Sequence, residues 1–435
     1  MSAEAFRDQV FSLPQLIRDT TWAVEDRARS VLGTPDLLNL RLAVLAGSGD
    51  SHIAARAGQY AWQALGGVPS FADDAMTAAR YRLDPIAAGQ RLRPLLVAVS
   101  NSGEVARVVE AAGRARAEGS AVLAVTASPD SRLARAADAV LLAAAPPFAP
   151  APGVRSYAMS LLGLYHLAIR IGEVRGRYTM DEAGALRRQL AGLADAIEAG
   201  LDAAATAAGA LAERWAEHSG TDLLGSGPGR ASADYGAAKL LEAAGVRGYG
   251  QDLEEFAHLH YFAADTTTPV LLVTSSTSAA RSRAAEVAKL LETLGRPAAT
   301  LSDEPLIGAH LPHAAGRCGD LPAAAAHRAA GAAGRRGHAA ARRRARPGRP
   351  GRLGRVRRRR HDPRQRHLPA DLPPLKGPTV VSTYRLRTDG NRAFDITDEI
   401  SAAVAASGVR EGIAVVSLPH TTASVGIISF PTRSA

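Results

Sequence analysis

Two serine-rich turns contain the residues of this sequence that are best suited to bind a ligand. The turn Gly47–Ser51 (GSGDS) follows the apolar run Leu42–Ala46, and the turn Ser100–Glu104 (SNSGE) follows the run Pro94–Val99. Glycine lets the backbone approach a ligand, and serine hydroxyls and the amides of a helix start can donate hydrogen bonds to it. One such turn alone is more simply a strand-to-helix loop with serine as the helix cap. Two at neighbouring strand ends favour a phosphate site.

A second set of residues has the types needed for acid–base chemistry. Lys239 and Glu242 in GAAKLLEAAG are spaced i, i+3, which places them on one face of a helix. The run Glu254–His258 (EEFAH) follows. Aldose–ketose isomerisation needs a base that moves a proton between adjacent sugar carbons and a group that opens the ring, so a Glu and a His converging on one pocket would serve. From spacing alone, a surface ion pair between Lys239 and Glu242 and a loop histidine are the simpler explanation.

The elements that must position these residues alternate along the first 300 residues. Short apolar runs end in Gly/Ser turns, and alanine-rich stretches with helical spacing lie between them, such as Val105–Glu118 and Ala279–Leu294. Alternation of this kind is typical of a parallel sheet with helices on both faces. The predicted strands are Leu42–Ala46, Pro94–Val99, Ala121–Val125, Ala139–Leu142, Asp222–Leu224 and Pro269–Val273.

The pattern occurs twice, over about 40–170 and again over about 220–305, and the turn GSGPG at 225–229 repeats GSGDS. Internal duplication is the economical explanation. The fold class is therefore α/β, with two tandem doubly wound parallel sheets of flavodoxin-like type. The second half has its own serine-rich turn, Thr274–Ser278, but it lacks the glycine of the first and we interpret it as a relic or a structural turn.

Six segments follow from these patterns. A helical lead-in covers 1–35, with Pro14 near a helix start, and the first domain covers 36–177. Linking helices cover 178–218, and the second domain covers 219–309 and should lose its last strand and helix where the composition changes. An Arg/Ala/Gly/Pro-rich segment covers 310–372, and a truncated β-rich fragment covers 373–435.

The two turns, together with TASPDSRLARAADAVLL at 126–142, resemble the sugar isomerase (SIS) domain of phosphosugar isomerases and phosphosugar-binding proteins. The duplicated arrangement resembles the isomerase half of glucosamine-6-phosphate synthase and the related fructosamine deglycases, over about 35–305. The resemblance implies a phosphate held by Ser48, Ser51, Ser100, Asn101, Ser102, Val154 and Ser156. It also implies that Glu242 transfers the proton and that Lys239 lies near the sugar, while His258 opens the ring and Glu255 is a further acid.

Three departures separate the chain from a synthase-type isomerase. Val105 stands where the family commonly has a phosphate-binding threonine, and His258 is followed by Leu-His-Tyr where the family has Gly-Pro. The family's catalytic lysine comes from a C-terminal tail, and the corresponding segment here contains no lysine. No glutaminase domain with an N-terminal cysteine nucleophile precedes residue 40, so we expect no glutamine-dependent amination by this chain alone.

Composition sets the outer limits on function. The chain has 435 residues, a net charge of +10 and a single cysteine, Cys318, which excludes a disulfide scaffold and a zinc cluster built on cysteines. No apolar run reaches the roughly 18 residues of a membrane helix, and the N-terminus MSAEAFRDQV lacks a signal-peptide core. We therefore expect a cytoplasmic protein without a membrane contact, a metal or a cofactor.

The positive charge belongs to one segment. Residues 310–372 contain 17 Arg, no Lys and three Asp, which gives +14 and leaves −4 for the rest of the chain. The segment consists mainly of Ala, Arg, Gly, Pro and His, and such a composition cannot build a core. It could be a disordered linker that binds polyanions, a solvated spacer, or a stretch translated out of frame from GC-rich DNA. Because it lacks aromatic residues that would stack on bases, we do not expect nucleic acid as its partner.

The last segment has a globular composition again from about Thr379. Its run Pro419–Ser424 (PHTTAS) resembles the HTTA motif of the secondary thiamine-phosphate synthase family, with His420 and Thr421 at matching positions. The family's later histidine-containing strands have no counterpart before Ala435, so an inactive fragment is the expectation. A lone histidine cannot hold a metal.

Together these observations predict a double SIS-domain protein that binds a phosphorylated sugar or amino sugar and forms a homodimer. Its activity would be phosphosugar isomerisation or deglycation-type cleavage. A catalytically inactive phosphosugar-binding or sensory protein is the alternative, and polyanion binding through residues 335–360 is a weaker one.

Overall fold

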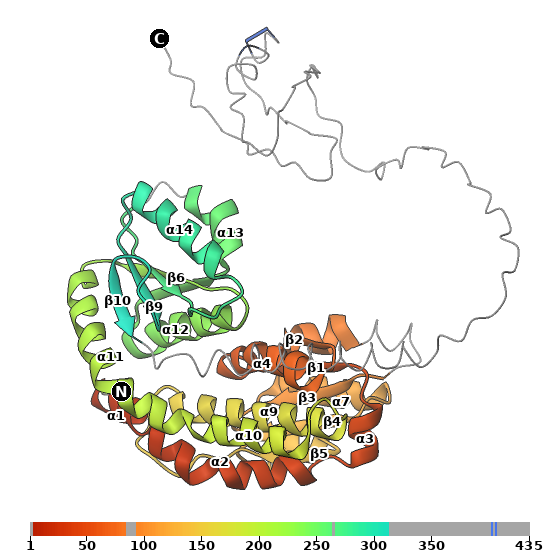
Figure 1. The fold of residues 1–435 in the computed structure, drawn as a ribbon. Coiled ribbons are helices and arrows are strands. Elements are labelled where there is room, and N and C mark those ends of the chain that lie inside the picture. The colour runs from red at the N-terminus through yellow and green to blue at the C-terminus, as the bar shows by residue number, and fades with distance from the viewer. Residues whose placement is uncertain (1–2, 84–92, 263–265, 313–401, 403–404, 407–435) are drawn as a thin grey trace, which may run out of the picture. The chain divides into compact units, whose positions relative to one another are not determined.

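A computed structural model describes residues 3–83, 93–262, 266–312, 402 and 405–406 of the chain. All the helices and strands discussed below lie in the unit Met1–Pro347 (Figure 1). The predicted segment 310–372 is described only as far as residue 312, and almost all of the predicted fragment 373–435 lies outside the described residues. Within the described part of the chain, no helix is long and apolar enough to cross a membrane.

The first sheet has five parallel strands in the order β2-β1-β3-β4-β5. They are β1 (Ala43–Gly47), β2 (Ser70–Asp74), β3 (Leu95–Val99), β4 (Val122–Thr126) and β5 (Ala139–Leu142). Every residue of β1, β3 and β4 is buried, as expected for central strands covered by helices on both faces. The strand order reverses between β1 and β3, and ligands bind at the carboxyl ends of the strands at such a switch point. Both serine-rich turns begin there.

Helices cover both faces of the first sheet. Apolar residues of α2 (Leu13–Ser30), α4 (Asp50–Ala61) and α9 (Val154–Val174) form one core with Leu45 and Val97. The short helices α5 (Ala75–Thr77) and α8 (Arg132–Ala136), the π-helix η2 (Ala78–Arg82) and the helix α7 (Ala106–Ala117) form a second core with Val44 and Leu96 on the other face. The N-terminal helix α1 (Ala3–Phe11), the helix α3 (Thr34–Asn39) and the π-helix η1 (Trp62–Gly66) complete the first half.

Two helices, α10 (Met180–Ala191) and α11 (Leu193–Trp215), follow the first sheet. Thr179 and Glu182 form a capping box at the start of α10. The second sheet is again fully parallel, in the order β10-β9-β8-β6-β7. Its strands are β6 (Gly220–Leu224), β7 (Arg247–Gln251), β8 (Val270–Val273), β9 (Ala298–Ser302) and β10 (Ala309–Pro312). Read from β7, this is the strand order of the first sheet, so the duplication expected from the two GSG turns extends to topology.

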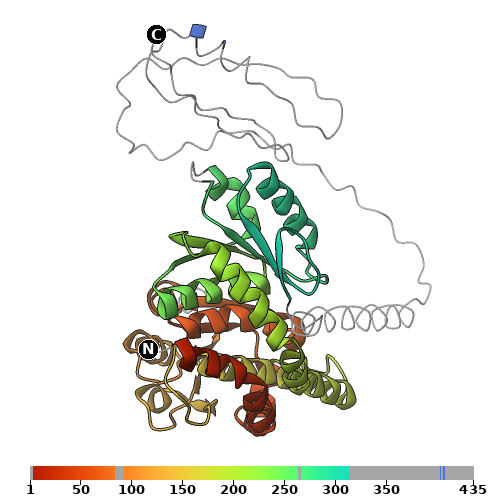
Figure 2. The same cartoon turned by 90° about the vertical axis from the view of Figure 1, so that its left-hand side faces the viewer.

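Helices cover both faces of the second sheet (Figure 2), and neighbouring residues of β6 pack against different ones. Leu223 of β6 packs with α12 (Pro228–Ala244), whereas Leu224 packs with α13 (Leu253–His258) and α14 (Arg281–Thr293). The short helix η3 (His260–Phe262) follows α13. Helices α12 and α13 therefore lie on opposite faces of the second sheet.

All six predicted strands are present, and the predicted helices over Val105–Glu118 and Ala279–Leu294 are α7 and α14. The sequence did not indicate β2, β7, β9 and β10. Strands β2 (SFADD), β7 (RGYGQ) and β10 (AHLP) lie at sheet edges, where an apolar run is not required. The expectation that the second half loses its last strand is wrong, because β10 pairs with β9 beyond the expected boundary at residue 309.

Candidate functional site

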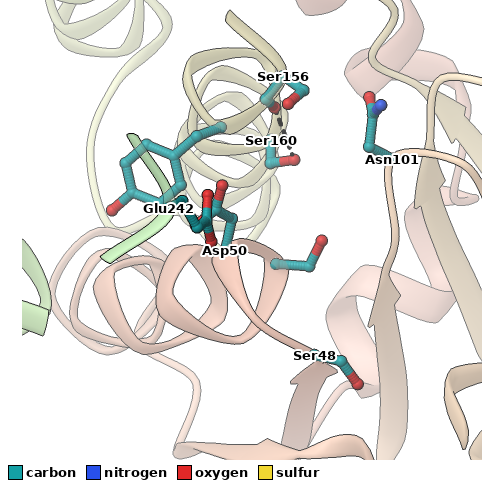
Figure 3. A pocket seen from close by; sticks show the side chains of 8 residues that line it. Ser48, Asp50, Asn101, Ser156, Ser160 and Glu242 are labelled. Atoms are coloured by element: carbon teal, nitrogen blue, oxygen red, sulfur yellow. Dashed lines mark hydrogen bonds between the residues drawn. The ribbon is translucent and has the colours of Figure 1, made fainter. Parts of the chain in front are cut away.

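A cavity of about 210 Å³ opens at the carboxyl ends of β1 and β3 (Figure 3). It is termed the serine cavity here. Its lining residues are Ser48, Asp50, Ser51, Asn101, Ser156, Tyr157, Ser160 and Glu242. Four of these, Ser48, Ser51, Asn101 and Ser156, are predicted phosphate-binding residues, and Glu242 is the predicted proton-transfer group. The first half thus supplies seven of the lining residues and the second half supplies one.

The first turn requires glycine at two positions. Gly49 has φ +57° and ψ −131°, a backbone conformation that residues with a Cβ rarely adopt, and it caps α4. A Cβ on Gly47 would lie 2.5 Å from the carbonyl carbon of Ser51. This tight turn sets Ser48 at the end of β1 and both Asp50 and Ser51 in the first turn of α4, at the edge of the cavity.

The second turn contributes less directly than expected. Asn101 lines the cavity, but Ser100 and Ser102 do not. The Ser100 hydroxyl is buried and accepts a hydrogen bond from the Gly103 amide at 3.2 Å, and the Ser102 hydroxyl accepts one from the Glu104 amide at 3.2 Å. Ser100 thus supports the turn from within, whereas Ser102 is exposed, and the phosphate contacts predicted for both serines stay predictions.

The start of α9 forms the third part of the lining. Gly153 caps the helix, and Ser156, Tyr157 and Ser160 face the cavity. Ser160 donates to the Ser156 carbonyl at 3.1 Å, one helical turn back (Figure 3). Val154 is buried and is not among the residues that line the cavity, so its predicted phosphate contact stays a prediction.

A charged group from both halves closes one side of the cavity. The Lys239 ammonium donates to Oδ2 of Asp50 at 2.6 Å and to Oε2 of Glu242 at 2.5 Å. The Lys239 side chain is only 8% exposed, whereas that of Glu242 is 45% exposed. A buried ammonium between two carboxylates is stable because both partners offset its loss of hydration. The i, i+3 pair predicted from spacing is therefore real, and it includes a third member from the first half.

Asp50 is the one residue of the Lys239–Glu242–Asp50 charged group that the sequence did not predict. Its Oδ1 is buried and has no hydrogen-bond partner within the described chain. Burial raises the pKa of Asp50 above its ordinary value, and the hydrogen bond from Lys239 opposes that rise. In Figure 3, Asp50 and Glu242 lie next to each other, and Asn101 lies across the opening from them. The signal was present in the GSGDS turn, whose aspartate is its only ionisable residue.

Two tyrosines stack beside this group. The rings of Tyr157 and Tyr235 are parallel to within 14° at a centroid distance of 3.9 Å, and the Lys239 ammonium lies 5.1 Å from the Tyr235 ring centre. Burial raises the pKa of both hydroxyls, so they stay neutral. Tyr157 and Ser160 were missed as well, although Ser160 follows the predicted Ser156 by one helical turn.

His258 and Glu255 do not reach the serine cavity. They belong to α13, which packs on the face of the second sheet opposite α12. The His258 side chain is 62% exposed, and its Nε2 lies 2.8 Å from Oε1 of Glu254. The expected convergence of Glu242 and His258 on one pocket is therefore not met within this chain, because β7 separates α12 and α13 in sequence and leads to the other face.

The chain is thus a duplicated parallel α/β protein with a serine-rich cavity at the switch point of its first sheet. Comparisons with known proteins agree with this architecture. Residues 37–170 match the SIS domain family, so the predicted resemblance to SIS sugar isomerase proteins is confirmed. Residues 382–433 match the UPF0047 protein YjbQ-like family, and the thiamine-phosphate synthase assignment of that fragment stays a prediction.

Two curated relatives are glutamine–fructose-6-phosphate aminotransferases (isomerizing). The chain is 32% identical to that of Mycolicibacterium smegmatis over 226 residues, covering 51% of this chain and 35% of the relative. It is 34% identical to that of Streptomyces coelicolor over 201 residues, covering 45% and 31%. The chain thus spans about a third of the length of these relatives.

Solved structures share the fold. The C-terminal domain of glucosamine-fructose-6-phosphate aminotransferase from Francisella tularensis matches with a TM-score of 0.62 at 16% identity, over 74% of this chain and 91% of that one. Tagatose-6-phosphate ketose/aldose isomerase from Escherichia coli matches with a TM-score of 0.54 at 18% identity, over 73% and 90%.

Proposed function

We propose that the serine cavity binds a phosphorylated hexose or amino sugar and that Glu242 isomerises it between aldose and ketose forms. The observation that carries the proposal is that one cavity is lined by Ser48, Ser51, Asn101 and Ser156 as well as by Glu242. The uncharged donors suit a phosphate, and the carboxylate suits proton transfer at the sugar carbons. The names of the curated relatives specify fructose 6-phosphate, which supports the same substrate class.

The proposed chemistry uses the charged group as a unit. The Glu242 carboxylate removes the proton from the carbon next to the sugar carbonyl, which gives an enediolate. The former carbonyl oxygen takes up a proton from water and the neighbouring hydroxyl gives one up to water, and Glu242 then returns its proton to the former carbonyl carbon. Lys239 fixes the position of this carboxylate through its 2.5 Å hydrogen bond. Asp50 holds Lys239 from the other side, so that one ammonium serves both carboxylates. Deglycation-type cleavage of an amine-substituted sugar phosphate would use the same base.

A second candidate is binding without turnover. It is favoured by the position of His258, whose ring pairs with Glu254 outside the serine cavity. Its ring-opening role, and that of Glu255 as a further acid, stay predictions. If the chain is a phosphosugar-binding or sensory protein, ligand affinity will be high and isomerisation will be absent.

One variant separates the two candidates. The purified full chain is incubated with fructose 6-phosphate and glucosamine 6-phosphate, and thermal unfolding and sugar interconversion are both measured. Under the isomerase proposal, Glu242→Gln lowers the turnover rate by about 10²–10⁴-fold and leaves the ligand-induced stabilisation in place. Glu286→Gln, an exposed change on α14, is the matched control and should leave both unchanged.

Two outcomes would reject the proposal in part or in whole. Stabilisation by the sugar phosphates without turnover of the unaltered chain would favour the binding protein. No stabilisation by any sugar phosphate would remove both candidates.

Three further points belong to the proposal. We propose the division of the chain into the segments given above, with the second domain extended to include β10. We also propose a homodimer, which light scattering of the full chain would test. Polyanion binding through residues 335–360 would be revealed by salt-sensitive binding that is lost when those residues are deleted.

A further inference from the structure

A second cavity lies at the opposite edge of the first sheet, where β1 and β2 begin. Its volume is about 320 Å³, and it is lined by Leu38, Arg41, Gly67, Arg175 and Arg177. It is termed the arginine cavity here. Three of its five lining residues are arginines and none is acidic.

Each arginine is anchored through one terminal nitrogen. Nη1 of Arg175 donates to the Leu40 carbonyl at 2.8 Å and also reaches the carbonyls of residues 37 and 38. Nη2 of Arg177 donates to the Ala64 carbonyl at 3.2 Å, and Nη1 of Arg41 donates to the Leu38 carbonyl at 3.4 Å. A guanidinium carries five N–H donors, so most of them remain available. Nε of Arg177 is buried without a hydrogen-bond partner in the described chain.

These anchors do not neutralise the charge of the cluster. The carbonyls belong to the ends of α3 and η1, and Arg175 itself ends α9. A helix end carries at most about half a negative charge, so three ends offset roughly half of the three positive charges. None of the three arginines has a carboxylate partner among the described residues. In contrast, the buried Arg187 of α10 pairs with Glu173 at 2.8 Å and Glu25 at 2.7 Å.

The arginines lie close enough to repel one another. The pKa of Arg175 is lowered, first by burial and then by the charges of Arg41 and Arg177. The backbone leaves room for this arrangement at Gly67, which has φ +65° and where a Cβ would collide with the Arg177 guanidinium. An anion would relieve the repulsion and use the spare donors, and guanidinium forks match phosphate oxygens in geometry.

We propose that the arginine cavity binds a small phosphate-bearing anion with two or more negative charges, at a site separate from the serine cavity. The volume lies at the lower end of small-molecule sites, which suits a diphosphate or a small phosphate ester better than a single ion. Helix α9 contributes to the serine cavity at its first turns and leads into Arg175 at its end. The stretch from Ser156–Ser160 to Arg175 separates the two sites by about 25 Å along the helix.

The test measures binding of inorganic pyrophosphate to the full chain by titration calorimetry. We expect the double variant Arg41→Gln with Arg177→Gln to weaken pyrophosphate binding at least about tenfold, because two charge-assisted contacts are lost. The matched control is Arg107→Gln with Arg114→Gln, which removes the same charge from the surface of α7, where both arginines pair with Glu110. The Arg-rich segment 310–372 is identical in both variants, so their difference isolates the cavity.

Two further arms complete the test. ADP and citrate are titrated in parallel, and loss of ADP or pyrophosphate affinity in the cavity variant alone supports the site. The proposal is overturned if neither phosphate compound binds, if the cavity variant binds them as well as the control does, or if only citrate binds. Should the double variant fail to fold, Arg41→Gln alone is used, because Arg41 is exposed and its hydrogen bond to the Leu38 carbonyl is long, at 3.4 Å.

Discussion

The first turns of the two halves have the same backbone and different surroundings. Gly49 has φ +57° and ψ −131°, and Gly227 has φ +58° and ψ −129°. Each caps a long helix that follows the first strand of its sheet. Only the turn at Gly49 borders the serine cavity.

The two halves differ in whether the serines of their turns are hydrogen-bonded to nearby aspartates. In the second half, Ser226 donates to Oδ2 of Asp252 at 2.7 Å, and Asp303 accepts from both the amide and the hydroxyl of Ser276. In the first half, Asp74 stands at the place of Asp252, and both aspartates cap the helix that follows. Oδ2 of Asp74, however, accepts from the Thr77 hydroxyl and not from Ser48 of the glycine turn. A glycine turn therefore supplies donors in both halves, but the second half uses them on its own acids.

The largest expected effect comes from placing a carboxylate in the first half. Asn101→Asp should weaken fructose 6-phosphate binding at least about a hundredfold, because two like charges about 4 Å apart repel by roughly 4 kcal/mol at an effective dielectric constant near 20. Ser275→Asp places the same charge two residues after β8, as Asn101 follows β3, and should leave binding unchanged. Calorimetry of both variants compares the halves directly, and equal losses would contradict the difference described above.

Acid should weaken the first half before the second. His166 of α9 is buried beside Thr21, and burial lowers its pKa to about 4 from 6.5. The unfolded chain therefore takes up the proton first as pH falls, so the stabilisation is complete above about pH 6.5 and declines toward pH 4, by roughly 3 kcal/mol in total. No histidine is buried in the described part of the second half.

Hydrogen exchange measured peptide by peptide at pH 7.5 and pH 4.5 would follow this loss. We expect reduced protection in the first sheet and little change in the second. In the His166→Gln variant, the difference in protection between pH 7.5 and pH 4.5 should be smaller. An unchanged difference would assign the acid sensitivity to another group.

The smallest expected effect comes from replacing by alanine the glycine that caps the helix after each turn. A Cβ on Gly49 or Gly227 meets no atom within 4 Å, so alanine at either position introduces only backbone strain of about 1–3 kcal/mol. Urea unfolding should show similar losses for Gly49→Ala and Gly227→Ala. Fructose 6-phosphate affinity should fall several-fold for Gly49→Ala alone, because that turn positions Ser48 and Ser51. A loss of affinity in both variants would argue for a ligand contact in the second half.

Much of the site was readable from local sequence. The glycine–serine turns predicted Ser48, Ser51 and Asn101, and the i, i+3 spacing predicted that Lys239 and Glu242 meet. Asp50 could not be assigned in the same way, because its partner Lys239 lies 189 residues away. Ser100 has the residue type and spacing of a ligand contact, and only the tertiary structure shows that its hydroxyl is buried against the Gly103 amide and is not among the residues that line the cavity.

Local sequence patterns were enough to predict the parallel α/β class, the duplication and the two serine-rich turns, because apolar runs and glycine positions act over a few residues. Packing between distant parts of the chain sets which serine hydroxyls bind carboxylates and which charged side chains contact one another. Asp50 contacts Lys239, and the serine turns of the second half donate hydrogen bonds to Asp252 and Asp303. His258 lies on the far face of its sheet. These outcomes depend on which face of a sheet each helix covers, and that is set by packing across long separations in the chain.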